Sequence, residues 1–501
     1  MTEDTTPILI GGGQITQRDV DPAGALEPLD LMAEAARRAA VNAGSGPGIL
    51  HGLDTIAVVN VFCWDYGNAP RLLAERVGAH PTREMYTTIG GNSPQWIVNE
   101  LAGQVAAGTV RLALVAGAEA VYTLARSRRT QARLAWASHA GEHATSVGGT
   151  QLGTNDYELT HNLQLPVQIY PFFENAIRAA RGWSLAQHRH ELGALCARFS
   201  AVAAENPHAW FPQARTAEEI ATVTPDNRMI AFPYPKRMNA IIDVDQGAAA
   251  LVTSVATARA LGIPQERWVY LRGVADAHDH WYVSERVSYH TSPAIRAAGQ
   301  AALAMAGLDV GEVDHFDLYS CFPSAVQIGR DMLGIPRDDP RPLTVTGGLP
   351  YFGGPGNNYS LHAIVTMLDR VRDRRGSTGL VSALGWFLTK HSIGVYSAAP
   401  PAGPWRRPDP AAPQRLVDAD PKPVLCMEPS GAATIETYTV VYGRDGTPLV
   451  GLVIGRLADG RRFLASAPDD RDVLESLTTR EAVGLPGHAS CHDRVGRFDP
   501  A

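Results

Sequence analysis

The chain of 501 residues is too long for one simple core, and its 45% of hydrophobic residues is ordinary for a globular protein. No apolar run approaches the roughly 20 residues that cross a bilayer, and the N-terminus lacks the basic start and apolar core of a signal peptide. A net charge of −7 without a Lys/Arg block argues against nucleic acid as the main partner, and five scattered cysteines without metal-binding spacing favour a reduced, cytoplasmic protein with no metal site.

The first part of the chain predicts alternating helices and strands. A helical pattern at 29–44 precedes an apolar strand at 55–61. The glycine triplet at 11–13 lacks the spacing of a nucleotide-binding loop, so we expect a tight exit from a strand there. Residues 90–94 (GGNSP) open a helical run that ends at Gly108, and an alternating strand follows at 110–117.

The same pattern returns near residue 350. A helix at 295–307 precedes a strand at 315–319, residues 353–358 (GGPGNN) open another helical run, and a strand follows at 379–385. A repeat of more than 100 residues predicts two similar half-domains packed against each other. A site in such a fold lies where loops of both halves meet.

Composition divides the chain into five regions. Residues 1–120 form the first half, 121–250 an insertion that returns to it, and 251–398 the second half. Residues 399–420 are rich in proline and predict a stiff, extended linker. Alternating segments at 435–442, 449–457 and 461–465, joined by Asp-Gly turns, predict a small β-barrel within 421–501.

Several motifs resemble the thiolase superfamily over residues 5–398, nearest to its sterol-carrier-protein type. Residues 113–119 (ALVAGAE) are similar to the strand after the nucleophile helix, and 245–250 (DQGAAA) to the DGAAA motif. Residues 316–322 (FDLYSCF) stand where that type carries His-Asp-Cys-Phe, and 353–355 where thiolases carry Gly-His-Pro. The resemblance implies a layered α-β-α-β-α fold of two similar halves, with an insertion and a fused module similar to an OB-fold.

The catalytic residues that the resemblance implies are missing. The nucleophilic cysteine aligns with Gly91, the histidine of Gly-His-Pro with Gly354, and the second cysteine with Ala383. At the His-Asp-Cys-Phe motif the first two residues are Tyr319 and Ser320. Without a thiolate at the helix N-terminus there is no acyl-enzyme, so we expect standard thiolase activity to be absent.

Tyrosines are the first candidates for the remaining chemistry. Thiolase-like retro-aldolases that act on CoA esters, which this chain resembles, use one tyrosine at the position of Tyr319 and another in the Gly-His-Pro loop, and they work with an OB-fold partner. Tyr359 lies in that loop, one position off, and Tyr351 lies just before it. Tyr319 is therefore a candidate acid or base; the alternative is that Tyr319 caps a strand and Tyr359 packs on a helix.

Two further residues, Cys321 and His391, are weaker catalytic candidates. Cys321 is a possible nucleophile, but a cysteine before Phe-Pro, like Cys63, more often fills a core. His391 follows a predicted strand end, where it can act as a base or polarise a thioester carbonyl, or remain a surface or capping histidine.

Binding candidates lie in three segments. Gly91, Asn92 and Ser93 open a helix whose free N–H groups can hold an anion or a thioester oxygen, with helix capping by Asn92 or Ser93 as the simpler alternative. The resemblance places Lys236 and Arg237 near the CoA entrance, where they suit phosphates. The loop replacing Gly-His-Pro adds Gly354 and Asn358.

Three functions remain open. The first is non-covalent, aldolase-like cleavage of an acyl-CoA, with Tyr319 moving the proton. The second is acyl-CoA or lipid binding without catalysis, with CoA as ligand and no covalently bound cofactor. The third is assembly, in which the barrel module docks a partner enzyme or a second copy of the chain.

Overall fold

The computed structural model describes residues 4–138 and 143–501. The N-terminal half combines mainly buried strands with amphipathic helices: β1 (Pro7–Thr16), β2 (Thr55–Val58), β3 (Arg83–Thr87), β4 (Leu112–Ala120), β5 (Thr145–Val147), β8 (Asp245–Ser254), α1 (Pro28–Asn42), α2 (Ala69–Val77), α3 (Ser93–Ala106) and α9 (Val255–Ala260). The C-terminal half uses β9 (Val269–His278), β10 (His315–Asp317), β11 (Thr378–Gly385), β12 (Lys390–Ser397), α10 (Pro293–Ala306), α11 (Pro323–Leu333) and α12 (Tyr359–Asp373).

The two halves have matching topology. The order β2-β4-β8-β1 in one half corresponds to β10-β11-β12-β9 in the other. In each half the first pair of strands is parallel and the next two pairs are antiparallel. The predicted duplication is thus confirmed. The two sheets are joined where β1 meets β9, at Ile8↔Tyr270 and Leu9↔Val269.

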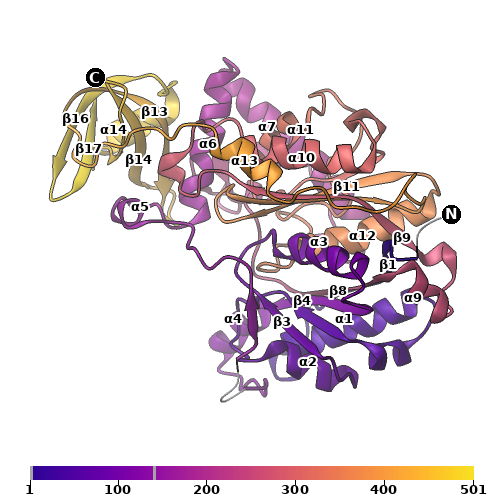
Figure 1. The fold of residues 1–501 in the computed structure, drawn as a ribbon. Helices are drawn as coiled ribbons and strands as arrows, with labels where there is room; N and C mark the ends of the chain where they lie inside the picture. Colours follow the sequence, from indigo (N-terminus) through magenta and orange to yellow (C-terminus); the bar gives the residue numbers. More distant parts are fainter. Residues whose placement is uncertain (1–3, 139–142) are drawn as a thin grey trace.

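The layers follow the predicted α-β-α-β-α arrangement (Figure 1). Helices α3 and α12 lie between the two sheet halves, α1 and α2 cover one outer face, and α10 and α11 cover the other. Helix α1 packs very close to β1. A Cβ on Gly11 or Gly13 would lie only 2.1 Å from a carbonyl oxygen of α1, so glycine is needed at both positions. The predicted strand exit at this glycine triplet is wrong: β1 continues to Thr16, and the glycines make room for the helix.

The insertion between β4 and β8 supplies a mainly helical domain beside the second half: α4 (Val121–Thr130), α5 (Asp156–Thr160), α6 (Pro166–Ala180), α7 (Leu185–Glu205), α8 (Ala217–Ala221), β6 (Met229–Ala231) and β7 (Tyr234–Pro235). Helix α7 begins after its N-cap Ser184, whose side chain accepts from the Gln187 N–H at 3.2 Å. None of the helices in the described ranges combines the length and apolar content that a bilayer crossing requires.

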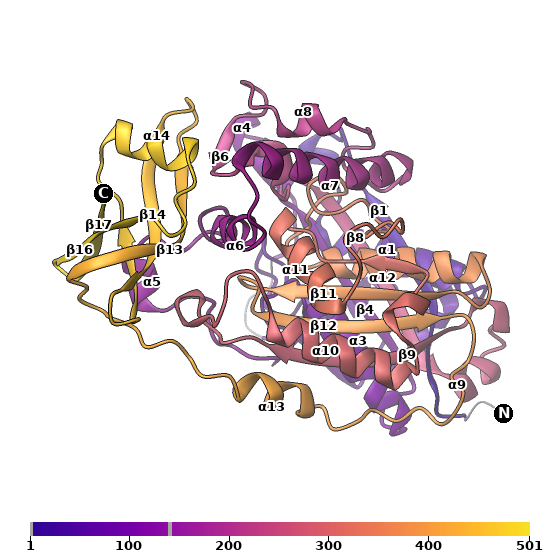
Figure 2. The same ribbon diagram turned by 90° about the horizontal axis from the view of Figure 1, so that it is seen from above.

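The proline content predicts an extended linker, but the linker is not extended throughout. It contains α13 (Ala412–Asp418), which tolerates Pro413 because a proline in the first helical turn loses no hydrogen bond. The linker follows the surface beside α10 (Figure 2). It is attached there by buried Trp405, whose Nε1 donates to the Leu271 carbonyl at 2.6 Å, and by Arg407, which pairs with Glu100 and Asp276.

The C-terminal module is a closed five-stranded barrel, as predicted, in which β13 pairs with both β14 and β16: β13 (Gly431–Tyr442), β14 (Pro448–Leu457), β15 (Arg462–Ser466), β16 (Pro486–His492) and β17 (Val495–Pro500), with α14 (Arg471–Thr479). One face of the barrel docks on this chain's own insertion (Figure 2). Thr437 donates to the Phe172 carbonyl of α6 at 2.6 Å, and Val441 pairs with Ala231 of β6.

Candidate functional site

Tyr319 and Gly91 are in direct contact at the start of α3. A Cβ on Gly91 would lie 2.1 Å from Oη of Tyr319 and 2.6 Å from the Leu384 carbonyl oxygen. The tyrosine therefore fills the space that a side chain at the nucleophile position needs. Burial raises the pKa of Tyr319 well above its usual value, so its phenol is held neutral.

Tyr359 belongs to a buried polar cluster beside Tyr319. The two rings meet edge to face, with centroids 5.6 Å apart. The Tyr359 hydroxyl donates to Asp317 Oδ1 at 3.0 Å and lies 2.6 Å from Thr346 Oγ1. Burial and the negative charge of Asp317 raise the Tyr359 pKa. Tyr359 is thus tied to the scaffold, while its ring orients that of Tyr319.

The two cysteines considered above, Cys321 and Cys63, are poor nucleophiles. Cys321 is buried, and burial raises its pKa to about 12, which leaves it a thiol near neutral pH. Burial and the nearby Glu119 also raise the pKa of Cys63. Both cysteines fit the alternative of core packing.

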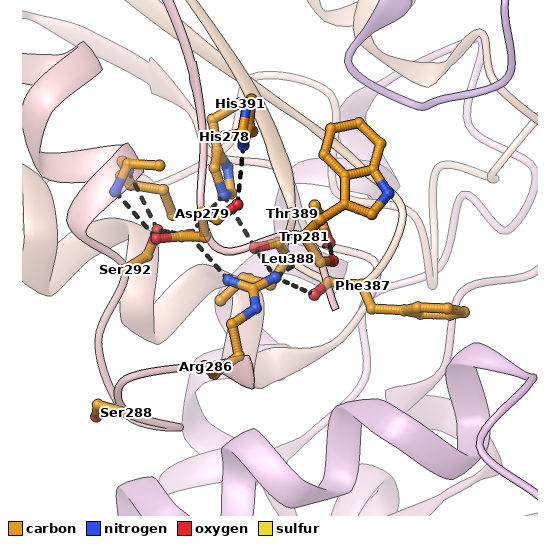
Figure 3. A network of polar contacts seen from close by, with 12 residues as sticks. His278, Asp279, Trp281, Arg286, Ser288, Ser292, Phe387, Leu388, Thr389 and His391 are labelled. Atoms are coloured by element: carbon orange, nitrogen blue, oxygen red, sulfur yellow. Dashed lines mark hydrogen bonds and ion pairs between the residues drawn. The ribbon is translucent and has the colours of Figure 1, made fainter. Parts of the chain in front are cut away.

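His391 is oriented by a buried ionic network (Figure 3). Its Nε2 lies 3.1 Å from the Leu388 carbonyl oxygen and 3.3 Å from Asp279 Oδ2. Because a carbonyl only accepts, Nε2 carries a proton and donates it. Asp279 also pairs with Arg286 at 3.0 Å, and Arg286 together with the accepted hydrogen bonds keeps the Asp279 pKa low. The histidine ring is therefore held with Nε2 toward Asp279 and the Leu388 carbonyl.

His391 borders two cavities of different size. This cavity, which we call the lysine pocket, has a volume of about 540 Å³ and is lined by residues that include Trp96, Asp276, His278, Trp281, Lys390 and His391. On its other side His391 reaches a cavity of only about 10 Å³ that also touches Tyr319. His391 thus lies between an open pocket and the Tyr319 contact.

The start of α3 forms one wall of the lysine pocket through Asn92 and Ser93. Neither side chain caps the helix, contrary to the simpler sequence alternative: Asn92 makes no capping hydrogen bond, and Ser93 Oγ donates to the Thr88 carbonyl at 2.9 Å. Asn92 Oδ1 is buried and has no hydrogen-bond partner among the described residues. Asn92 Oδ1 on this wall can therefore still accept a hydrogen bond.

The loop that replaces Gly-His-Pro reaches the start of α3 through its asparagine and serine residues. Asn357 Oδ1 accepts from the Gly90 N–H at 2.9 Å, and Ser360 Oγ donates to the Gly91 carbonyl at 2.7 Å. Asn358, predicted to bind substrate, instead donates to the Gly117 carbonyl at 2.6 Å. Gly354 donates its N–H to the Ile241 carbonyl at 2.7 Å. This loop therefore positions the backbone around Gly91.

A second large cavity lies against the same loop. This arginine pocket has a volume of about 840 Å³ and is lined by residues that include Arg18, Tyr122, Arg128, Arg129, Trp210 and Arg444. Its wall is bonded to the loop, because the N–H groups of Trp210 and Phe211 donate to the carbonyls of Phe352 and Tyr351 at 2.7 and 2.9 Å.

The predicted basic pair lies outside both pockets. Lys236 and Arg237 sit on the short 3₁₀ segment Lys236–Met238, where Arg237 donates to the Glu219 carbonyl at 2.7 Å and Lys236 faces solvent. Sequence reasoning missed the arginines of the pocket, since its lining comes from separate segments. The Arg128-Arg129 pair at the end of α4 was the available signal.

The family models and the first solved structure that match this chain are all thiolase-like. Residues 413–493 match the family model of the thiolase-like protein type 1 additional C-terminal domain, and residues 275–354 match the thiolase C-terminal domain-like model. The crystal structure of a monomeric SCP2-thiolase like protein type 1 from Mycobacterium smegmatis is 38% identical, with a TM-score of 0.87 and coverage of 100% of both chains.

More distant structures share the fold alone. The Ltp2-ChsH2(DUF35) aldolase has a TM-score of 0.60 at 19% identity, covering 78% of this chain and 98% of that chain. Acetyl-CoA acetyltransferase from Syntrophomonas wolfei has a TM-score of 0.57 at 17% identity, covering 79% and 100%. A curated relative, acetyl-CoA acetyltransferase 1 of Arabidopsis thaliana, is 30% identical over 139 residues, which are 28% of this chain and only 31% of that relative's length.

Proposed function

The chain belongs to the thiolase superfamily, among the SCP2-thiolase-like proteins of type 1, and we propose from this premise that it binds acyl-CoA thioesters without attacking them through a cysteine. The observation that carries the proposal is the arginine pocket. CoA presents phosphates and an adenine ring, and the pocket offers guanidinium groups beside aromatic rings. Its volume of about 840 Å³ suits a ligand of that size.

The charges of this pocket are available to a ligand. Arg128 and Arg129 are exposed and form no ion pair with any residue in the described ranges. Asp19 and Asp243 also line the pocket, so its four arginines leave an excess of positive charge. Tyr122 and Trp210 meet edge to face at 5.1 Å and offer a ring surface for the adenine. The pocket is basic although the chain carries a net charge of −7.

The arginine pocket connects to the former catalytic position through the loop at 349–360. Ile241 lines the pocket and accepts the Gly354 N–H, and the same loop holds the backbone of Gly90 and Gly91 through Asn357 and Ser360. We place the thioester end of the ligand along this loop. Tyr319 occupies the side-chain space at Gly91, so no acyl-enzyme forms there.

A second candidate is aldolase-like proton transfer by Tyr319. The edge-to-face contact with Tyr359 favours it, because this contact fixes the Tyr319 ring at the position of a catalytic histidine in the resembled motif. Its test is the replacement Tyr319→Phe, assayed on β-hydroxyacyl-CoA thioesters. This candidate is rejected if Tyr319→Phe turns over the thioester as fast as the unchanged chain, or if neither protein shows turnover. Either result leaves the binding function open.

Calorimetric titration with CoA and acetyl-CoA tests the binding function. We expect the double replacement of Arg128 and Arg129 by Ala to weaken binding at least about tenfold, because each hydrogen bond to a charged group contributes about 1.5–3 kcal/mol. The matched control is the double replacement of Lys236 and Arg237 by Ala, which also removes two charges but lies outside the pocket. Absence of CoA binding, or an equal loss in both variants, rejects the proposal.

A further inference from the structure

The lysine pocket is a second cavity that the CoA proposal does not use. It shares no lining residue with the arginine pocket. Its walls come from the start of α3, the segment after β5, the end of β9, the start of β12 and linker helix α13. At about 540 Å³ it is large enough for a small organic molecule.

Lys390 is the unusual residue of this pocket. The chain has three lysines, Lys236, Lys390 and Lys422. Lys236 is exposed, and Lys422 pairs with Glu285 at 2.7 Å. Lys390 is partly buried, and its Nζ donates to the Ile89 carbonyl at 2.6 Å but forms no ion pair within the described part of the chain. Burial lowers its pKa to about 8, as expected for an ammonium without a counter-ion.

The other titratable groups of the pocket do not neutralise Lys390. Asp276 is engaged by Arg407 at 2.7 Å and by Asn99 at 3.2 Å. The two histidines are directed to groups other than Lys390: His278 Nδ1 donates to the Asp279 carbonyl at 3.0 Å, and His391 Nε2 donates to the Leu388 carbonyl at 3.1 Å. Lys390 is the only lysine or arginine side chain among the lining residues, and it has no carboxylate partner in the described part of the chain. An entering anion would therefore gain a partner and relieve an uncompensated charge.

Two indole side chains of the pocket suit an apolar body. Trp96 and Trp281 both line the pocket. Trp281 is held by a hydrogen bond from Nε1 to the Leu152 carbonyl at 2.7 Å and by an edge-to-face contact with His278 at 5.2 Å. The indole faces are thus preorganised, and one charge at one end of the cavity sets the orientation of a ligand.

We propose that the lysine pocket binds a small organic carboxylate, whose anionic group pairs with Lys390 while its apolar body lies against Trp96 and Trp281. A carboxylate fits better than a phosphate, because the pocket offers a single lysine and no arginine and also contains the carboxylate of Asp276. This site is independent of the CoA proposal and can stand if that proposal fails.

The test is a calorimetric titration of the full chain with hexanoate and phenylacetate, compared with hexanamide as the uncharged analogue of hexanoate. We expect hexanoate to bind at least about tenfold more tightly than hexanamide, in line with a charge-assisted hydrogen bond. Lys390→Met should weaken hexanoate binding by a similar factor. Lys236→Met and Lys422→Met are matched controls and should bind as the unchanged chain does.

The comparison of acid and amide on the unchanged chain does not depend on the folding of any variant. The affinity for hexanoate should also fall as the pH rises through about 8, where Lys390 loses its proton. Asp276 and His278 on β9 and His391 on β12 face the same cavity, and the Lys390→Met variant should lack this pH dependence. Equal binding of acid and amide, no binding of either acid at millimolar concentration, or undiminished binding in Lys390→Met overturns the proposal.

Discussion

Oη of Tyr319 lies 2.1 Å from the position that a Cβ on Gly91 would take. The two residues are far apart in the sequence, and each one alone looks like the loss of a catalytic group. Together they form one steric unit, in which the tyrosine occupies the space that the missing side chain leaves. The packing around α3 therefore leaves no room for a side chain at residue 91 while Tyr319 keeps its place.

This contact predicts strong coupling between the two positions. Gly91→Ala should destabilise the fold by about 1–3 kcal/mol, because the new methyl group overpacks the site. Adding Tyr319→Leu should recover part of this loss, since the ring end is removed while the Leu384 carbonyl still lies close. Urea denaturation of both single variants and the double variant measures the coupling. Additive losses would show that the two side chains do not compete for space.

Glu119 predicts a pH-dependent stability. It is 1% exposed, and burial raises its pKa to about 7, although it accepts the N–H groups of Phe62 and Cys63. Between pH 4.5 and 7 the folded state holds a proton that the unfolded state has released, so stability falls as the pH rises. Relative to the unchanged chain, Glu119→Gln should gain about 2 kcal/mol between pH 5 and pH 8.

Denaturation at the two pH values measures this difference. Glu34→Gln on the exposed face of α1 is the control and should show little change. A relative stability of Glu119→Gln that is the same at pH 5 and pH 8 would contradict the raised pKa of Glu119.

The sequence was sufficient for the layered fold but only for part of the site. Helix and strand periods repeat in the same order in both halves, so short stretches of sequence are enough to recognise the duplication. The helix start predicted at Gly91 lies within two residues of Ser93, where α3 begins. The arginine pocket cannot be read in this way, because Arg18, Trp210 and Arg444 meet only through tertiary packing. The linker helix was missed because proline content masks a helix whose proline lies in its first turn.

Lys390 predicts the opposite pH trend from Glu119. Its folded pKa of about 8 lies below the ordinary 10.5, so between these values the unfolded state holds the proton and stability rises with pH. Lys390→Met should therefore be more stable than the unchanged chain at pH 7, and this advantage should shrink above pH 8 and disappear near pH 10.5. Thermal unfolding across this range measures it, with exposed Lys236→Met as the control that should not change.

Two adjacent arginines test how the barrel is attached. Arg462 is fully buried, pairs with Glu436 and donates to the Ser284 carbonyl at 3.0 Å, whereas Arg461 pairs with Asp459 at the surface. Arg462→Met should cost about 2–3 kcal/mol, because the Ser284 and Arg286 carbonyls lose their buried donor, while Glu436 keeps Arg456 as a partner. Arg461→Met should cost much less, because its ion pair with Asp459 is exposed to solvent. Similar losses measured by urea denaturation would refute a special role of Arg462 in docking.

Binding of a thioester without covalent attack is tested most directly by intact-mass spectrometry of acid-quenched mixtures with saturating acetyl-CoA, at a concentration where calorimetry records binding. The expected result is a chain of unchanged mass at every time point, since neither Gly91 nor the neutral Cys321 supplies a thiolate. A chain that gains one acetyl group, and loses it again when free CoA is added, would reveal an acyl-enzyme and contradict the proposal.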